Sequence, residues 1–238
     1  MCTGIRYTLF DRMLTQPHLL IAGATGSGKS VVINGLIYNI LFDGPNKYRF
    51  ILIDPKRVEL VKYKTLPHTI KYASEPAEMY DALQIAMTIT ENRYKAMQKA
   101  GTVKYTGPGV YIIIDEFADL ILTDKRVKPL IQRLAQIGRA AAVHIVLATQ
   151  TPIAKVIPTE IKCNFDARCG LRTRSAQDSR NILGITGLET LPRYGQCIYM
   201  DPENTGKYIV PYVDAETLQQ HINHWTKPKN KLFSWLRR

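Results

Sequence analysis

A glycine-rich stretch near the amino terminus carries the clearest chemistry in this sequence. It reads Gly23-Ala24-Thr25-Gly26-Ser27-Gly28-Lys29-Ser30 and is followed by Val31. Glycines let the backbone curl so that successive N–H groups face an anion without obstruction from a Cβ atom. In this pattern the lysine reaches the β- and γ-phosphates of a nucleoside triphosphate, and the serine hydroxyl binds Mg²⁺. We therefore predict that residues 23–31 bind ATP, with Lys29 catalytic and Ser30 a metal ligand.

Two adjacent carboxylates, Asp115 and Glu116, follow the apolar run 111–114. We expect Asp115 to hold Mg²⁺, directly or through water, and Glu116 to orient and deprotonate the attacking water. An adjacent Asp-Glu pair alone would more simply mark the start of a helix, where carboxylates are favoured. After four apolar residues, and in a chain with the glycine-rich loop, hydrolysis is the better interpretation.

Gln150 and Arg139 are two further candidates for catalysis. Gln150 ends the next apolar strand, and the carboxyl ends of strands converge on the ligand in such sheets, so it is expected to sense the γ-phosphate or the attacking water. The alternative for Gln150 is a capping amide. Arg139 lies at the end of a predicted helix, where arginine commonly neutralises the helix dipole. Its other possible role is a finger that reaches the ATP of a neighbouring subunit, and spacing alone does not decide.

Alternating strands and helices are predicted to hold these residues in place. Apolar runs predict buried strands at 19–22, 50–53, 110–114 and 143–148, and helical spacing predicts helices at 31–42, 76–99 and 124–140. Such alternation indicates an α/β fold with a mainly parallel sheet flanked by helices. Beyond Thr149 the pattern is weaker. It predicts a strand at 166–171, a helix at 176–183 and a small carboxyl-terminal β-hairpin from 196–200 and 207–213.

The chain is basic, with 32 Lys and Arg against 20 Asp and Glu and a net charge of +12. This charge favours polyanionic partners such as nucleic acid or anionic lipid without choosing between them. No C-x-x-C pair occurs among the four cysteines, which argues against a zinc site, and His221 and His224 are interpreted as solvent-facing. No apolar run approaches the ~20 residues needed to span a bilayer, so we expect no integral membrane segment in this chain and a cytoplasmic location.

The carboxyl-terminal residues 227–238 form a basic tail that we separate from the domain at 1–226. Phe233, Trp235 and Leu236 are interleaved with its basic residues, so the tail could touch DNA or a membrane surface. A frayed end is the simpler alternative.

A series of motifs stands in order along the chain. They are 17–30 (PHLLIAGATGSGKS), 52–56 (LIDPK) with Glu59-Leu60, 114–120 (IDEFADL), 133–136 (RLAQ), 138–140 (GRA), 144–150 (HIVLATQ) and 178–180 (DSR). Together they resemble the motor domain of the FtsK/SpoIIIE family of DNA translocases. The resemblance implies a RecA-like P-loop ATPase core that uses ATP and Mg²⁺, forms a hexameric ring and drives double-stranded DNA through it. It also implies that Arg139 is the arginine finger acting in trans.

The family grips DNA phosphates with basic loops after the strand that ends in glutamine. By position this implies Lys162 and Arg180, and more weakly Lys155, Arg172 and Arg174, although each could be an ordinary surface charge. The family usually has arginine after the glutamine, whereas here Thr151 stands there, so one phosphate contact is missing. The chain shows no anchor region and no recognisable winged-helix module. This fits a compact protein of a phage, plasmid or integrative element, or an excised motor domain.

Three other functions share parts of this motif set. A coupling ATPase for conjugative transfer would act on single-stranded DNA or nucleoprotein, and a protein-secretion ATPase would not need the basic residues. A non-motor, nucleotide-gated DNA clamp would use ATP only to assemble the ring. The Asp115-Glu116 pair argues against the clamp, because a clamp could lose Glu116 without penalty.

Overall fold

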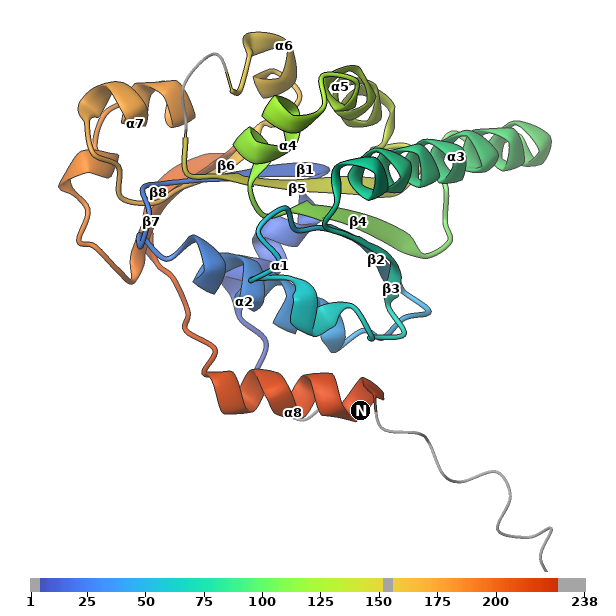
Figure 1. Ribbon diagram of the computed structural model, residues 1–238, viewed down its shortest axis with the longest axis horizontal. Helices are drawn as coiled ribbons and strands as arrows, with labels where there is room; N and C mark the ends of the chain where they lie inside the picture. Colours follow the sequence, from blue (N-terminus) through green and yellow to red (C-terminus); the bar gives the residue numbers. More distant parts are fainter. Residues whose placement is uncertain (1–4, 152–155, 227–238) are drawn as a thin grey trace, which may run out of the picture.

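One sheet of eight strands runs through the residues that the computed structural model describes, 5–151 and 156–226 (Figure 1). In spatial order the strands are β3 (Thr69–Ala73), β2 (Tyr48–Ile53), β4 (Gly109–Ile114), β5 (Val143–Thr149), β1 (His18–Ala22), β6 (Ala167–Gly170), β7 (Gln196–Asp201) and β8 (Asn204–Ile209). The pairs from β3 to β6 are parallel, and β7 and β8 are antiparallel. The predicted α/β class with a mainly parallel sheet is confirmed.

Helices cover both faces of this sheet (Figure 1). On one face lie α1 (Thr8–Thr15), α2 (Lys29–Leu41) and α8 (Ala215–Thr226), and on the other α3 (Pro76–Ala100), α4 (Phe117–Thr123), α5 (Val127–Ile137), α6 (Thr159–Lys162) and α7 (Ala176–Leu183). A large apolar core fills each side. Every residue of β1 and β4 is buried, which explains why both strands read as unbroken apolar runs.

The opening segment forms α1, although its pattern predicts no helix. Its two turns are too short to show a clear period, yet Leu9, Phe10 and Met13 enter the core. The Phe10 ring lies directly against α2 at Gly35, where any Cβ atom would collide with it. Gly35 therefore allows α1 to pack closely on the helix that follows the glycine-rich loop.

The helix predicted at 124–140 is wrong at both ends. A separate helix, α4, begins at Phe117 directly after Glu116, and α5 covers only Val127–Ile137. Between them Asp124 is extended and its side chain accepts a hydrogen bond from the Arg126 amide. After α5 a tight turn at 138–142 leads into β5. Arg139 lies in this turn, not on the helix.

Two strands also differ from the prediction. The edge strand β3 has no predicted counterpart, because five residues with one exposed apolar side chain, Ile70, give little signal. The hairpin is present, but its second strand is Asn204–Ile209 instead of 207–213. The Asp201 side chain accepts hydrogen bonds from the amides of Glu203 and Asn204 and so closes a tighter turn than the pattern indicates.

Some expectations concern residues away from the sheet. His221 is buried against Tyr38 at a ring distance of 4.4 Å, so the solvent-facing interpretation is wrong for it. Within the described ranges no group of three His, Cys, Asp or Glu could hold a metal ion. No helix among the described residues is long and apolar enough to cross a membrane. Lys155 and the tail at 227–238 lie outside the described residues, and the domain boundary at 226 stays a prediction.

Candidate functional site

The glycine-rich loop connects β1 to α2 at the carboxyl edge of the sheet. Gly26 and Gly28 have φ angles of 73° and 101°, which residues with a Cβ rarely adopt. Among the described residues the N–H groups of Gly26, Gly28 and Lys29 have no hydrogen-bond partner. These N–H groups lie at the start of α2, where the helix dipole also favours negative charge. The loop is therefore built to receive a phosphate chain.

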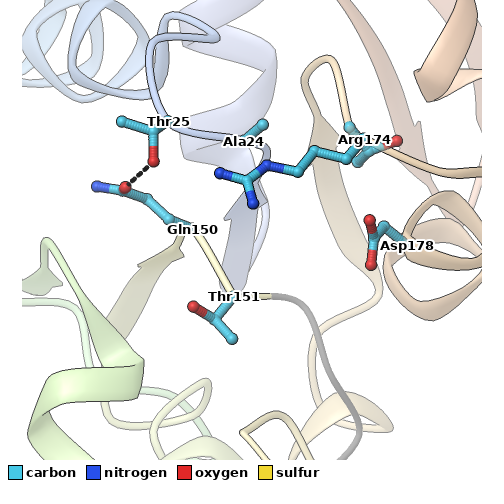
Figure 2. Close-up of a pocket in the computed structure, with 7 residues that line it drawn as sticks. Ala24, Thr25, Gln150, Thr151, Arg174 and Asp178 are labelled. Carbon is cyan, nitrogen blue, oxygen red and sulfur yellow. Dashed lines mark hydrogen bonds between the residues drawn. The ribbon is translucent and has the colours of Figure 1, made fainter.

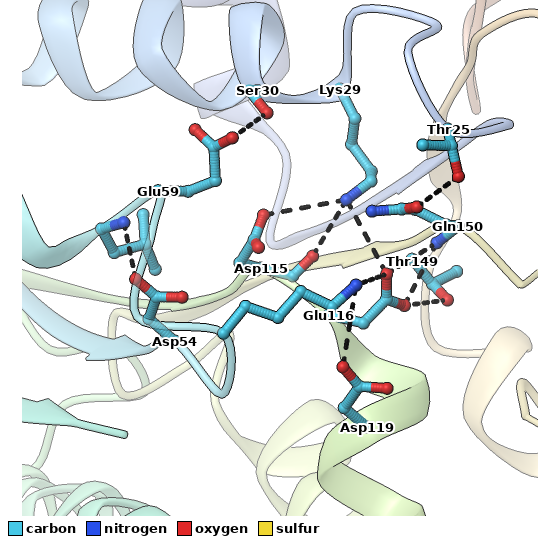
Figure 3. A network of polar contacts seen from close by, with 12 residues as sticks. Thr25, Lys29, Ser30, Asp54, Glu59, Asp115, Glu116, Asp119, Thr149 and Gln150 are labelled. Atoms are coloured by element: carbon cyan, nitrogen blue, oxygen red, sulfur yellow. Dashed lines mark hydrogen bonds and ion pairs between the residues drawn. The ribbon is translucent and has the colours of Figure 1, made fainter.

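Lys29 lies inside a group of carboxylates at the same edge (Figure 3). It is 6% exposed, and its Nζ atom lies 3.3 Å from the Asp115 carbonyl, 3.7 Å from Asp115 Oδ1 and 4.0 Å from Glu116 Oε2. β4 pairs with β2 on one side and β5 on the other, so Asp115 and Glu116 emerge between the ends of β2 and β5, which lead into Asp54 and Gln150. The parallel register thus brings together residues far apart in the sequence.

The surroundings of Asp115 suit a divalent cation. Burial raises the pKa of Asp115, the carboxylates of Glu59, Asp54 and Glu116 raise it further, and Lys29 opposes them. Its Oδ1 atom is buried and accepts no hydrogen bond. A buried carboxylate oxygen without a hydrogen-bond donor is costly. The raised pKa indicates that Lys29, 3.7 Å away, does not fully offset this cost, and a divalent cation would.

Ser30 is the second predicted metal ligand. Its Oγ atom donates a hydrogen bond of 2.6 Å to Glu59 Oε1 (Figure 3). Mg²⁺ in such sites is commonly bound by one or two protein oxygens, phosphates and water, so Ser30 and Asp115 fit it. Glu59 belongs to a motif identified in the sequence, but its contact with Ser30 was not predicted.

Glu116 is held in one orientation by several donors (Figure 3). Its carboxylate is 2% exposed and accepts hydrogen bonds from Thr149 Oγ1 at 2.7 Å and from the Gln150 amide at 3.1 Å. Lys56 Nζ lies 3.4 Å from Oε2. Thr149 and Lys56 are functional candidates whose contact with Glu116 sequence reasoning missed, although Thr149 ends β5 and Lys56 belongs to the motif at 52–56. An oriented carboxylate beside Lys29 can position a water molecule for attack.

Gln150 connects the end of β5 to the glycine-rich loop. Its Oε1 atom accepts a hydrogen bond of 2.6 Å from Thr25 Oγ1 (Figure 2). The cavity beside this contact has a volume of about 260 Å³ and is lined by Ala24, Thr25, Gln150, Thr151, Thr173, Arg174 and Asp178. The structure places Gln150 beside the phosphate loop, and its role there stays a prediction.

Two of the arginines predicted to bind DNA lie beside the glycine-rich loop. The Arg172 carbonyl accepts a hydrogen bond of 2.8 Å from the Ala24 amide, and Figure 2 shows the Arg174 side chain extending toward Ala24. Both arginines line a cavity of about 560 Å³ together with Arg193, which sequence reasoning missed. Adding a Cβ to Gly26 would bring it 3.3 Å from the Arg193 guanidinium. This position suits contact with nucleotide phosphates.

Lys162 and Arg180 occupy different environments. Lys162 Nζ donates a hydrogen bond of 2.8 Å to the Asn181 carbonyl, and burial lowers its pKa. This contact ties α6 to α7. Arg180 is exposed on α7. Of these two predicted DNA contacts, Arg180 is therefore the more available to a partner.

A third cavity beside the loop is apolar. Its volume is about 280 Å³, and its lining is Ser27, Gly28, Val31, Leu171, Tyr194, Gly195, Val210 and Tyr212. Tyr194 and Tyr212 are 61% and 69% exposed. Their rings offer flat surfaces on which a planar group can stack.

Arg139 lies at the opposite edge of the sheet from the glycine-rich loop. Its turn precedes β5, whereas the loop follows β1, and the parallel register pairs His18 with Ile145 and Ala22 with Thr149. The length of β5 separates the two edges by roughly 20 Å. Arg139 is exposed and borders a cavity of about 600 Å³. It cannot reach the phosphate loop of its own chain.

Comparison with known proteins agrees with this arrangement. The model of the FtsK/SpoIIIE family matches residues 3–110 and 105–154. The DNA translocase FtsK of Rickettsia bellii is 37% identical over 260 residues, covering 89% of this chain and 34% of that protein. FtsK of Pseudomonas syringae pv. tomato is 36% identical and covers 88% of this chain and 31% of its own length. The chain thus spans about a third of these relatives.

Solved structures share the fold. The pCW3 conjugation coupling protein TcpA, solved with ATPγS, has a TM-score of 0.77 and 23% identity and covers 88% of this chain and 65% of its own. The secretion ATPase EccC of Thermomonospora curvata has a TM-score of 0.76 and 23% identity, with coverages of 89% and 28%. The family model matches more than half of this chain, and the FtsK relatives named above are more than a third identical to it. The chain therefore belongs to the FtsK/SpoIIIE family and is a P-loop ATPase.

Proposed function

We propose that this chain is the motor of an ATP-driven translocase of double-stranded DNA that works as a hexameric ring. The observation that carries the proposal is the separation of Arg139 from its own phosphate loop by the length of β5. An exposed arginine at the edge opposite the phosphate loop of its own chain suits neighbouring copies that complete each other's sites. The name of its relatives, DNA translocase, supports DNA as the substrate.

Each residue of the site has a role in this proposal. Residues 23–31 bind the phosphates, and Lys29 neutralises charge on the β- and γ-phosphates. Ser30 and Asp115 would hold Mg²⁺, which supplies further positive charge at the phosphates when bound. Glu116 orients the attacking water and accepts its proton, while Thr149 and Lys56 hold the carboxylate in place.

Other parts of the site bind the rest of the nucleotide and the DNA. The apolar cavity with Tyr194 and Tyr212 receives the nucleobase by stacking, because it lies directly beside Gly28 and Val31. Arg174 and Arg193 contact phosphates of the nucleotide. Arg180 is the leading DNA contact. Lys162, predicted on the same footing, ranks below it because its Nζ atom already bonds the Asn181 carbonyl, and Lys155 and Arg172 remain weaker proposals. We propose action in the cytoplasm, where ATP and DNA are both available.

The test is ATPase activity with and without long linear duplex DNA, together with displacement of a triplex-forming strand. Wild type should be stimulated by duplex and displace the third strand, whereas Lys29→Ala should do neither. Duplex binding should weaken steeply with salt, because condensed counterions are released. Absence of any stimulation at low salt would contradict the proposal.

The same assay separates the alternatives. Stimulation by single strands in preference to duplex would indicate a coupling ATPase for conjugation. Indifference to both nucleic acids would favour a protein-secretion ATPase. Full biological activity of Glu116→Gln would indicate a clamp, because only a motor needs repeated hydrolysis.

A further inference from the structure

We infer that Arg93, a buried arginine of α3, is a positioning residue for Arg139. The inference rests on the proposed function, in which Arg139 completes the nucleotide site of a neighbouring subunit. Arg93 does not face that neighbour, since only 9% of it is exposed. Its effect would pass through the turn that carries Arg139.

The contacts of Arg93 are unusual for a buried cation. Nη1 donates hydrogen bonds to the carbonyls of Ala141 at 2.7 Å and Ala142 at 3.0 Å, and Nη2 donates one of 2.6 Å to the Pro108 carbonyl. The Tyr105 ring lies 4.3 Å from its guanidinium carbon. No carboxylate of the described residues forms an ion pair with it. Its charge is therefore balanced by backbone carbonyls and one ring.

These contacts belong to a larger set of hydrogen bonds that hold the turn at 138–142. Every backbone carbonyl from Ile137 to Ala142 accepts a hydrogen bond. The donors are Tyr94 Oη to Ile137, the Val143 amide to Gly138, the Ala142 amide to Arg139, the Tyr105 amide to Ala140, Arg93 to Ala141, and Arg93 with the Val110 amide to Ala142. Three of the six donor residues, Arg93, Tyr94 and Tyr105, belong to α3 and the segment after it. The conformation of the turn is thus stabilised by residues distant from it in the sequence.

The turn needs these hydrogen bonds because its backbone is strained. Ala142 has a φ of 51°, a left-handed conformation that residues with a Cβ seldom adopt. Arg93 bonds the carbonyl of this same residue. Without Arg93 the carbonyl of Ala141 would lose its donor, and the strained turn could relax.

The side chain of Arg139 contrasts with this fixed backbone. It is exposed and forms no ion pair with any residue in the described ranges. An arginine that stabilises a transition state in another subunit must be placed accurately, since a misplacement of about 1 Å can cost about 100-fold in rate. Arg93 supplies that accuracy. It also bonds Pro108, in the same segment as Lys104, which borders the Arg139 cavity.

The experiment measures DNA-stimulated ATPase of Arg93→Met alone and mixed with other variants. Alone, it should turn over about 10- to 100-fold more slowly than wild type, with the affinity for ATP unchanged. Mixed with Lys29→Ala it should regain activity, because the Lys29→Ala subunit brings an intact Arg139 to the intact phosphate loop of its neighbour. Mixed with Arg139→Ala it should not regain activity, since neither subunit then supplies a well-placed arginine.

Two further variants control for folding. Lys95→Met removes an exposed cation from the same helix and should leave turnover unchanged. Tyr105→Leu removes the ring beside Arg93 but keeps the carbonyl bonds, so it should slow turnover several-fold and be rescued by Lys29→Ala in the same way. Should Arg93→Met fail to fold, Tyr105→Leu decides, and normal turnover of Tyr105→Leu would overturn the inference.

The outcomes distinguish this inference from the proposed function. If Lys29→Ala rescues Arg139→Ala but not Arg93→Met, Arg93 acts on its own subunit and the inference is wrong. If Arg139→Ala itself is not rescued, the completion of sites between subunits is wrong, and the role of Arg93 falls with it. Loss of ATP affinity in Arg93→Met would likewise overturn the positioning role.

Discussion

The two edges of the sheet are organised in opposite ways. At the carboxyl edge charged side chains are buried and contact each other, as Lys29 does with Asp115 and Glu116. At the amino edge the Arg139 side chain is exposed, while every backbone carbonyl from Ile137 to Ala142 accepts a hydrogen bond. A site for a ligand bound by the same chain needs fixed side chains. In the proposed ring, a residue that acts in another subunit needs a fixed backbone and an exposed side chain.

The largest effect is expected at the carboxyl edge. Lys29→Ala should reduce ATP hydrolysis by about 1,000-fold or more, because the charge that neutralises the β- and γ-phosphates is lost. Fluorescent-nucleotide binding should weaken in parallel. Lys99→Ala, an exposed lysine at the end of α3, is the matched control and should behave as wild type. Tight nucleotide binding by Lys29→Ala would show that the loop acts without its lysine.

Arg139→Ala tests the amino edge. Hydrolysis should fall by about 1,000-fold, the usual contribution of an arginine finger, while the affinity of each subunit for ATP stays the same. Steady-state ATPase and nucleotide titration measure the two quantities. If affinity fell as much as turnover, the contrast between the edges would be lost, because Arg139 would then act in its own chain.

Acid should destabilise the fold through two buried histidines. Burial lowers the pKa of His18 and of His68 to about 4, with His144 adding to the effect at His18 and Arg49 at His68. Below about pH 6.5 the unfolded chain takes up protons that the folded chain does not. The contribution of these histidines to the free energy of unfolding should therefore be constant above pH 6.5 and fall toward pH 4, by about 3 kcal/mol per histidine.

Urea denaturation at several pH values checks this dependence. His68→Phe should reduce the pH slope, because His68 stacks on Phe50 with neither ring nitrogen hydrogen-bonded. An unchanged slope in His68→Phe would mean that His68 is already protonated in the folded state at pH 5.

Thr149→Val sharpens the role assigned to Glu116. It removes the hydrogen bond of 2.7 Å to Glu116 Oε1 but leaves the hydrogen bonds that the backbone N–H of Gln150 and Lys56 Nζ donate to Glu116. Turnover should fall about 10-fold with KM nearly unchanged, because the hydrogen bond orients a base and does not bind substrate. Thr88→Val, exposed on α3, is the control. A rise in KM instead would place Thr149 in nucleotide binding.

The smallest effect is expected in the apolar cavity. Tyr212→Ala should raise KM for ATP by about 3- to 10-fold, which corresponds to about 0.5–1.5 kcal/mol of stacking, with little change in turnover. An unchanged KM would remove Tyr212 from the nucleobase site.

Much of the candidate site could be predicted because its signals are local. Glycines at left-handed φ, a lysine and serine at the start of a helix, and carboxylates after a buried strand depend on neighbouring residues alone. The contacts of Glu116 with Thr149 and Lys56 could not be predicted, because the three residues follow or end different strands. Likewise α1 and β3 are too short to show a period, and their burial comes from the rest of the fold.

The sequence by itself determined the fold class, the phosphate loop, the Asp115-Glu116 pair and the family. Only the tertiary structure decided which groups meet. Parallel pairing of β1 with β5 brings Gln150 to Thr25 and separates Arg139 from the same loop, although Arg139 and Gln150 are close in sequence. The physical reason is that a strand carries the chain from one edge of the sheet to the other, so residues at its two ends serve different sites.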